Sequence, residues 1–168
     1  ALQHIDRHAV HVLPTTAGCL TPNDAVSTAH IGAELLGTQW VKLEVAGCSR
    51  TWLPDMEGTL EAARELVREG FHVVPTCQGD PVLCARLADI GCVAIFAMAA
   101  PFDDAQDVIH PKRLALLREM VSIPIIVDAG HGSTSNATLI MELGMDAVFS
   151  DAAIGRAADP ISMAQAMK

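Results

Sequence analysis

The sequence predicts an α/β protein whose strands and helices form a TIM-type (β/α) barrel, and two observations favour this fold class. Short β-rich runs alternate with longer segments that start at a helix cap and end at glycine. Most of these runs are almost continuously apolar, as expected for parallel strands covered on both faces. Six such units share 168 residues, about 28 each, close to the roughly 31 residues per unit of an eight-unit barrel.

Six units are two fewer than a closed eight-stranded barrel requires. We therefore expect residues 1–168 to form one partial barrel domain. An unusual closure or an open doubly wound sheet is the alternative, because these arrangements share the same alternation of strands and helices. The dinucleotide-binding form of the open sheet is not favoured, since no GxGxxG motif follows any expected strand.

The six expected strands are runs rich in β-branched and aromatic residues. They lie at residues 11–13, 40–45, 71–74, 93–96, 123–127 and 147–149. Proline at the first helical position marks four helix starts, and glycine marks four helix ends. The starts are Thr21-Pro22, Asp80-Pro81, His110-Pro111 and Asp159-Pro160, and the ends are Gly37, Gly70, Gly91 and Gly144.

The charge of the chain excludes some classes of partner. Twenty acidic residues against eleven basic ones give a net charge of -9, and no basic stripe interleaves with aromatic residues. Binding to nucleic acids or to anionic membranes is therefore not expected. No apolar run reaches the roughly 18–20 residues that span a bilayer, and no basic-then-apolar leader opens the chain. We expect a soluble, cytoplasmic protein.

The cysteine pattern indicates neither a disulfide framework nor a CxxC motif. The number of cysteines is odd, and no two stand closer than seven positions apart: Cys19, Cys48, Cys77, Cys84 and Cys92. We expect reduced, mostly buried thiols. Only His8 and His11 have a local ligand spacing, and no cysteine pair stands beside them. The sequence therefore predicts no metal and no other cofactor.

Lys42 and Glu44 form the most informative pair in the sequence. Because strand side chains alternate, these two share one face, and the apolar residues between and around them share the other. If the apolar face meets the helices of a barrel, Lys42 and Glu44 point into its interior. Desolvation lowers a lysine pKa and a neighbouring carboxylate raises it, and a lysine in that balance can form a Schiff base. A structural ion pair, or an edge-strand lysine that discourages aggregation, is the alternative.

Asp128 ends an apolar strand, and a glycine-bearing loop follows it at residues 129–133. Active sites of barrels gather at the carboxyl ends of the strands. A glycine loop before a helix N-terminus can also hold a phosphate. A tight turn needs glycine in any case, so the loop alone is weak evidence. Together with Lys42 and Glu44, it favours a site built from three strand positions.

Several motifs, in this order and spacing, resemble bacterial thiazole synthase over essentially the whole chain. They are Leu13-Pro14-Thr15-Thr16-Ala17-Gly18, Val41-Lys42-Leu43-Glu44-Val45, Leu53-Pro54-Asp55, Glu69-Gly70-Phe71, Asp80-Pro81-Val82-Leu83, Ile126-Val127-Asp128-Ala129-Gly130, Met141-Glu142-Leu143-Gly144, Asp159-Pro160 and Ala166-Met167-Lys168. The second and sixth of these together are specific to the family. The chain resembles a thiazole synthase that lacks the first two β/α units and the final helix.

This resemblance implies an enzyme that builds the thiazole ring of thiamine from 1-deoxy-D-xylulose 5-phosphate, a glycine-derived imine and sulfur. It implies that the sulfur arrives as a thiocarboxylate on a small ubiquitin-like carrier protein, and that the barrels assemble as homotetramers. By position, Lys42 would form an imine with the sugar ketone, and Glu44 and Asp128 would move protons. Ala129 and Gly130 match positions that bind the sugar phosphate.

Two segments depart from the family pattern near the expected phosphate site. Residues 101–107 read Pro-Phe-Asp-Asp-Ala-Gln-Asp where the family usually has Pro-Ile-Gly-Ser-Gly-Gln-Gly, so Asp103 stands in place of a glycine. Asp151 and Ala152 replace an Asn-Thr pair after the last strand. Because a carboxylate repels a phosphate dianion, we expect these departures to weaken binding of the sugar phosphate.

Two other functions stay open from the sequence. In one, the chain is a degenerate barrel that persists as a non-catalytic binding or structural subunit, with the missing strands supplied by another chain. In the other, it is a Schiff-base aldolase or another phosphosugar enzyme of related architecture. The aldolase function needs a reactive Lys42 but no sulfur carrier.

Overall fold

The computed structural model describes residues 5–6, 9–99, 110–129 and 133–167. Its centre is a parallel sheet of five strands in the order β1-β2-β3-β4-β5, so each strand pairs with the next one along the chain. The strands are β1 (Trp40–Leu43), β2 (His72–Cys77), β3 (Ile95–Met98), β4 (Ile125–Asp128) and β5 (Ala147–Phe149). This arrangement confirms the predicted parallel β/α architecture.

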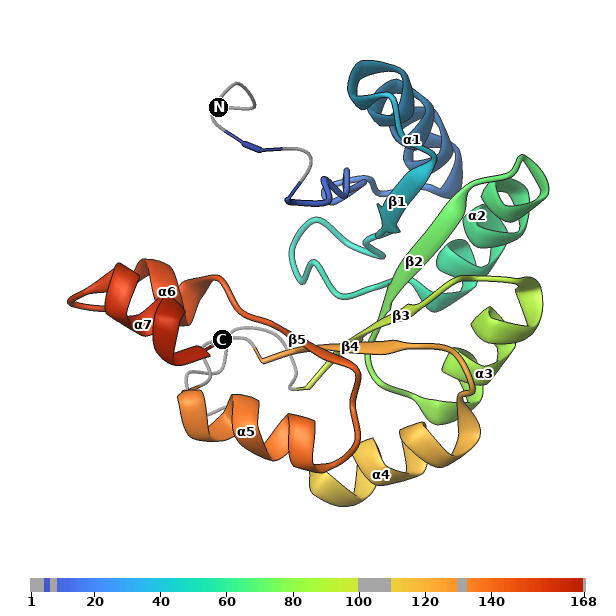
Figure 1. Cartoon of the computed structure of the whole chain (residues 1–168). Helices are drawn as coiled ribbons and strands as arrows, with labels where there is room; N and C mark the ends of the chain where they lie inside the picture. Colours follow the sequence, from blue (N-terminus) through green and yellow to red (C-terminus); the bar gives the residue numbers. More distant parts are fainter. Residues whose placement is uncertain (1–4, 7–8, 100–109, 130–132, 168) are drawn as a thin grey trace.

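The helices that precede or connect the strands lie along the outer side of the curved sheet, and two further helices follow the last strand (Figure 1). They are α1 (Pro22–Leu36), α2 (Met56–Arg68), α3 (Pro81–Ile90), α4 (Pro111–Met120), α5 (Thr134–Glu142), the short α6 (Ala152–Gly155) and α7 (Pro160–Met167). Each of the four predicted starts is a proline at the first helical position. Gly37 and Gly91 end α1 and α3 in the left-handed conformation, at φ of 62° and 106°. The predicted helix boundaries at these sites are confirmed.

The caps differ in quality. The Asp80 carboxylate accepts hydrogen bonds from the backbone N–H groups of Val82 and Leu83, and Thr21 caps α1 in the same way. His110 precedes α4 without a side-chain cap bond. Proline at the first position therefore fixes the start of α4 by its restricted φ alone.

The two faces of the sheet have different roles. On β1, the side chains of Val41 and Leu43 are fully buried in the large cluster that the strands form with the helices. Lys42 points to the opposite, inner face, where Phe96 belongs to a second and smaller apolar cluster. The period-two alternation predicted from the sequence is thus confirmed for β1.

Side chains from the two ends of the sheet meet on the inner face. Lys42 of β1 has its Nζ atom 4.0 Å from the ring centroid of Phe96 and 5.6 Å from that of Phe149, which lies on β5. Because β1 and β5 are the first and last strands in the sheet order, this contact requires a strongly curled sheet. The described strands therefore form an arc of a barrel, in which β1 and β5 are not paired with each other.

The predicted strand at residues 11–13 is not formed. The chain instead runs beside β1 at residues 14–16, where Thr15 makes an isolated parallel bridge to Lys42. The Lys42 N–H donates to the Pro14 carbonyl at 2.8 Å, and the Thr16 N–H donates to the Lys42 carbonyl at 3.1 Å. Since Pro14 has no N–H group, the pairing cannot extend into a regular ladder on its side.

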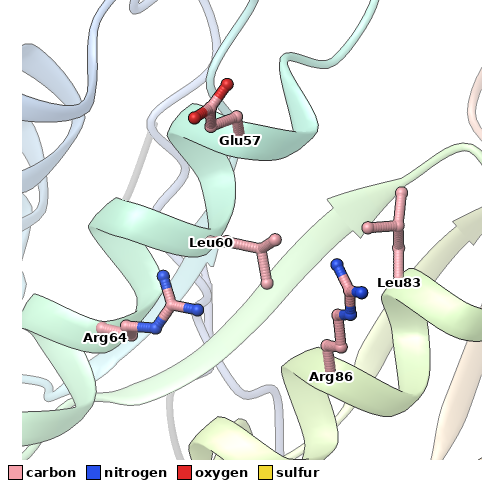
Figure 2. Close-up of a pocket in the computed structure, with 5 residues that line it drawn as sticks. All are labelled: Glu57, Leu60, Arg64, Leu83 and Arg86. Carbon is pink, nitrogen blue, oxygen red and sulfur yellow. The ribbon is translucent and has the colours of Figure 1, made fainter.

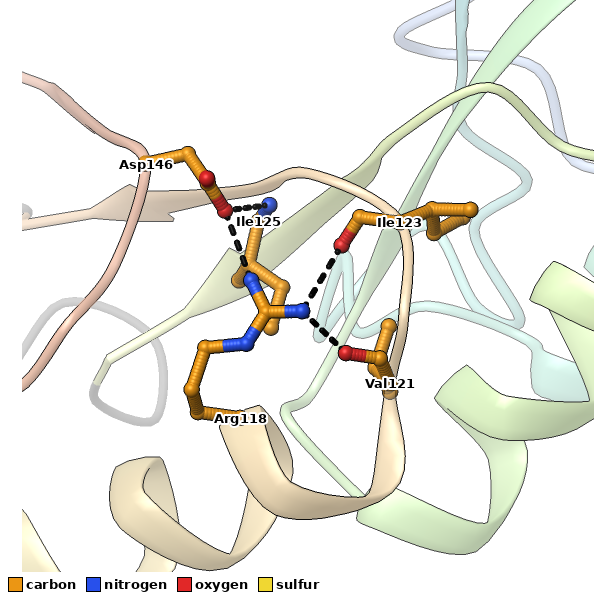
Figure 3. Close-up of polar contacts among 5 residues, drawn as sticks. All are labelled: Arg118, Val121, Ile123, Ile125 and Asp146. Carbon is orange, nitrogen blue, oxygen red and sulfur yellow. Dashed lines mark hydrogen bonds and ion pairs between the residues drawn. The ribbon is translucent and has the colours of Figure 1, made fainter.

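A polar cluster fixes the start of β4 relative to α4 and β5 (Figure 3). The Arg118 guanidinium donates to Asp146 at 2.8 Å, and also to the carbonyls of Val121 and Ile123. The same Asp146 oxygen accepts the N–H of Ile125 at 2.8 Å. This cluster ties the amino-terminal edge of β4 to its neighbours, on the edge opposite to Asp128.

The helices in the described ranges are too short or too polar to cross a membrane.

Candidate active site

Lys42 and Glu44 lie together at the carboxyl end of β1, as the sequence predicts. The Lys42 Nζ atom is 3.6 Å from Glu44 Oε2, and the two side chains are 20% and 21% exposed. They face the inner side of the curved sheet, away from the helices. The ammonium is thus largely removed from water but stays in contact with one carboxylate.

Two aromatic rings complete the surroundings of Lys42. Phe96 is 3% exposed and lies directly beneath the ammonium, and Phe149 lies beside it with its centroid 5.1 Å from that of Phe96. A cation over a ring face is held by the negative face of the ring. Sequence reasoning missed both rings. The alternation along β3 and β5 carries the signal, because it places them on the same face as Lys42 once the sheet is curled.

A buried threonine positions the backbone of Glu44. The backbone of Lys42 is hydrogen-bonded to the Pro14 carbonyl and to the Thr16 N–H. The Thr16 hydroxyl also donates to the Glu44 carbonyl and accepts from the Glu44 N–H, both at 2.8 Å. Thr16 is fully buried. The segment at residues 14–16 therefore fixes the backbone at Lys42 and Glu44 by hydrogen bonds. The sequence predicted a strand just before this segment, at residues 11–13, and gave no role to Thr16.

Asp128 lies on the same face of the sheet as Lys42. It alternates with Ile125 and Val127, which are fully buried on the helix side, and it is half-buried at the carboxyl end of β4. Across β4 and β5 its register partner is Phe149, the ring beside Lys42. The structure therefore brings Lys42, Glu44 and Asp128 to the same inner face of the sheet.

The expected phosphate-binding residues are only partly described. Asp103 and Gly130 lie outside the described residues. Ala129 is buried, with its methyl group in the helix-side core, and its N–H donates to the Phe149 carbonyl at 3.0 Å. Asp151 is exposed and caps α6 through the Ala152 N–H. Because the Ala129 N–H is already paired, a phosphate near this position has to find other donors.

Thr76 adds a polar group to the inner face that the sequence did not single out. It is 4% exposed on β2, opposite Phe96 of β3 in the register. Its hydroxyl has no hydrogen-bond partner among the described residues. Buried hydroxyl groups are nearly always bonded, so Thr76 is a group on this face that a bound molecule can satisfy.

A separate groove lies between α2 and α3 on the outer side (Figure 2). It has a volume of about 370 Å³ and is lined by Glu57, Leu60, Arg64, Leu83 and Arg86. Figure 2 shows the two guanidinium groups directed into the space between the helices. Because Leu60 belongs to the helix-side core, the sheet separates this groove from Lys42, and it is not part of the same site.

Within the described ranges, no three His, Cys, Asp or Glu side chains gather closely enough to hold a metal ion.

Comparison with known proteins identifies the family. The family model described as Thiazole biosynthesis protein ThiG matches residues 1–168. The chain belongs to this family. Among its ThiG-family relatives, the thiazole synthase of Sorangium cellulosum is 52% identical over 159 residues, which are 95% of this chain and 61% of that protein. The thiazole synthase of Aquifex aeolicus is 47% identical over 167 residues, which are 99% of this chain and 62% of that protein.

The chain thus spans about three fifths of the length of the curated ThiG-family relatives that it matches. Among solved structures, the Amycolatopsis orientalis BexX/CysO complex superimposes with a TM-score of 0.90 at 33% identity, over 99% of this chain and 67% of that chain. A 3-hexulose-6-phosphate synthase superimposes with a TM-score of 0.62 at 19% identity, over 88% of this chain and 68% of that chain. This second likeness concerns the fold alone, and it supports the barrel-type architecture.

Proposed function

We propose that this chain carries the imine-forming site of a thiazole synthase, the activity for which its ThiG-family relatives are named. The placement of Lys42 is the observation that carries the proposal. Its amine is mostly buried at the carboxyl end of a barrel strand, 3.6 Å from a carboxylate and 4.0 Å from an aromatic ring. We also propose that residues 1–168 act as one partial barrel domain, since each strand pairs with the next.

In the proposed reaction, Lys42 Nζ adds to the ketone carbon of 1-deoxy-D-xylulose 5-phosphate. The carbonyl oxygen leaves as water, so a C=N bond to Lys42 replaces the C=O bond. Glu44, which lies within 3.6 Å of the amine, takes up the amine proton and returns it to the departing oxygen. Asp128 approaches from β4 and removes a proton from the neighbouring carbon during enolisation. A glycine-derived imine and a sulfur atom then complete the ring.

The sugar phosphate is expected to bind near the carboxyl ends of β4 and β5, at the positions of Ala129, Asp151 and Ala152. The family resemblance assigns Gly130 and Asp103 to the same site, and both lie outside the described residues. The exposed Asp151 carboxylate places negative charge where a neutral asparagine is usual in the family. A like charge roughly 4 to 6 Å away in a partly screened site costs on the order of 1 to 3 kcal/mol. We therefore expect the chain to bind the sugar phosphate weakly.

A protein partner that delivers sulfur is part of the proposal. BexX, which is 33% identical to this chain, was solved as a complex with a second protein, CysO. That pairing supports a protein partner here, and we propose a small ubiquitin-like carrier that ends in a thiocarboxylate. We also propose that several copies of the chain assemble, because the family resemblance implies a homotetramer.

Reduction with borohydride tests the proposal directly. The protein is mixed with 1-deoxy-D-xylulose 5-phosphate, and borohydride then reduces any C=N bond to a stable amine. We expect the tryptic peptide that contains Lys42 to gain the mass of one substrate less one oxygen atom, because water leaves and the reduction adds two hydrogens. Trypsin should no longer cleave after that residue. A Lys42→Arg variant should gain no mass.

Lys112→Arg is the matched control, because Lys112 lies exposed on α4, and this variant should label like the original chain. Labelling that survives Lys42→Arg would exclude Lys42 as the imine-forming residue. Labelling at Lys42 without any transfer of sulfur from a thiocarboxylated carrier would favour the Schiff-base aldolase. No labelling at any sugar phosphate concentration would favour the non-catalytic subunit.

A further inference from the structure

Cys77 and Cys84 form a buried pair of thiols outside the site described above. Their sulfur atoms lie 2.8 Å apart, and both side chains are fully buried. A disulfide bond is ~2.05 Å long, so the two sulfurs need to approach by less than ~1 Å to be joined. Both belong to the helix-side core, not to the inner face that carries Lys42.

The local fold brings the two cysteines together although six residues separate them. Cys77 is the last residue of β2, and the turn at residues 78–80 leads directly into α3. Gly79 has φ of 69°, which allows the tight reversal. Cys84 lies in the first turn of α3, where side chains lean back toward the helix start and hence toward β2.

The surroundings make the two thiols chemically different. The hydrogen bond from Cys84, the Gly79 N–H and the positive charge of Arg113 lower the pKa of Cys77. The same hydrogen bond and burial raise the pKa of Cys84. Arg113 lies close to this turn, since a side-chain carbon at Gly79 would be 3.7 Å from its Nε atom. That Nε atom is buried without a hydrogen-bond partner among the described residues.

We propose that Cys77 and Cys84 are a redox-sensitive dithiol that a hydroperoxide converts reversibly into an intramolecular disulfide. The Cys77 sulfur attacks one oxygen of the hydroperoxide, the O–O bond breaks, and Cys77 becomes a sulfenic acid. The Cys84 sulfur then attacks the Cys77 sulfur, the S–O bond breaks, and the S–S bond forms. With hydrogen peroxide, two thiols and one peroxide give one disulfide and two molecules of water.

The other cysteines offer internal controls. Cys92 is buried with its pKa raised to about 12 by desolvation, and Cys48 is exposed with its pKa lowered by the N–H groups of Arg50 and Thr51. Trypsin releases residues 69–86 as one peptide that contains both Cys77 and Cys84, and the remaining cysteines lie on other peptides. The pair can therefore be followed separately from each of the other cysteines in one digest.

The experiment exposes the folded, reduced chain to hydrogen peroxide, blocks free thiols with iodoacetamide under denaturing conditions, and measures the tryptic peptides by mass. We expect peptide 69–86 to lose about 2 Da, to resist alkylation, and to recover two alkylation sites after treatment with dithiothreitol. In a Cys84→Ala variant, Cys77 should instead be captured by dimedone as a sulfenic acid, at least about tenfold more than in the original chain.

Cys92→Ala is the control variant, and it should form the same internal link as the original chain. Two results would overturn the proposal. One is a fully alkylated peptide 69–86 after Cys48 has been oxidised, which means that the pair does not react in the folded chain. The other is equal dimedone capture of Cys77 with and without Cys84, which means that Cys84 does not resolve the sulfenic acid. The readout does not depend on thiazole formation, so it is independent of the proposed function.

Discussion

Glu44 and Asp128 reach the inner face from different strands, and Glu44 Oε2 lies 3.6 Å from the Lys42 amine. If both carboxylates move protons, replacing either by its amide should leave borohydride trapping at Lys42 largely intact. Thiazole formation should fall by roughly a hundredfold or more, the usual size of a general acid–base effect. The measurement compares Glu44→Gln and Asp128→Asn in trapping and in turnover.

Glu57→Gln is the matched control, because Glu57 lines the outer groove between α2 and α3. This variant should turn over at the normal rate. Normal turnover of both amide variants at the inner face would show that these carboxylates are structural.

Thr76 predicts a stability change whose sign is informative. Its buried hydroxyl has no partner among the described residues, so Thr76→Val removes an unsatisfied polar group while keeping the side-chain shape. We expect the free energy of unfolding to rise by about 1 kcal/mol in urea titrations. Thr59→Val is the control, because the Thr59 hydroxyl donates to the Asp55 carbonyl at 2.6 Å, and this variant should lose stability. A similar loss in both variants would contradict the assignment of Thr76.

The buried Cys92, between α3 and β3, leads us to expect that the free energy of unfolding falls at alkaline pH. Cys92 follows the Gly91 cap, is 3% exposed, and has its pKa raised to about 12 by desolvation. Between about pH 9 and pH 12 the unfolded thiol gives up its proton while the folded one keeps it, so stability is full below pH 9 and falls as the pH rises. One such group costs about 1.4 kcal/mol per pH unit.

Urea unfolding of the reduced chain at several pH values between 8 and about 10.5 measures this slope. The Cys92→Ala variant should show a slope that is smaller by the contribution of one titrating proton. The Cys48→Ala variant, changed at an exposed position, should keep the original slope. The chain contains no tyrosine, which removes one common source of alkaline titration. An unchanged slope in Cys92→Ala would mean that this thiol ionises as easily in the folded chain as in the unfolded one.

Elements with strong local signals are the ones that the sequence predicts well. Proline at the first helical position and glycine after the last turn locate α1 and α3 closely. The prediction of a strand at residues 11–13 is wrong, because the backbone that pairs with Lys42 of β1 is that of residues 14–16. The pairing shifts to Thr15 and Thr16 beside Lys42. Tertiary hydrogen bonds decide this element, and a local pattern does not contain them.

The candidate site divides in the same way. Lys42 and Glu44 share a face because strand side chains alternate, which is a local rule, and the prediction is confirmed. Phe96, Phe149 and Thr16 approach this pair only because the sheet curls and an earlier segment runs beside β1. The alternation within β3 and β5 places the two rings on the inner face. It does not show that they meet Lys42, because that contact joins positions far apart in the sequence.

The open edge of the sheet at β5 leads us to expect self-association of the chain. On its far side β5 has no pairing strand among the described residues, and Phe149 on this strand is 38% exposed. An unpaired edge offers free N–H and C=O groups to another chain. We expect dimers or larger species whose share grows with protein concentration, as measured by size-exclusion chromatography with light scattering. A concentration-independent monomer of high thermal stability would contradict an open edge.

The ring of Phe96, 4.0 Å from the Lys42 ammonium, gives this lysine a magnetic environment of its own. The ring current shields protons above its face, so the ε-methylene resonance of Lys42 should stand upfield of that of Lys112 in an NMR spectrum of isotope-labelled lysine. The chain has so few lysines that single substitutions assign each signal. Uncurling of the sheet or formation of an imine moves the amine off the ring and the signal downfield. A single resonance thus reports any loss of the contact between Lys42 and Phe96, without any product being formed.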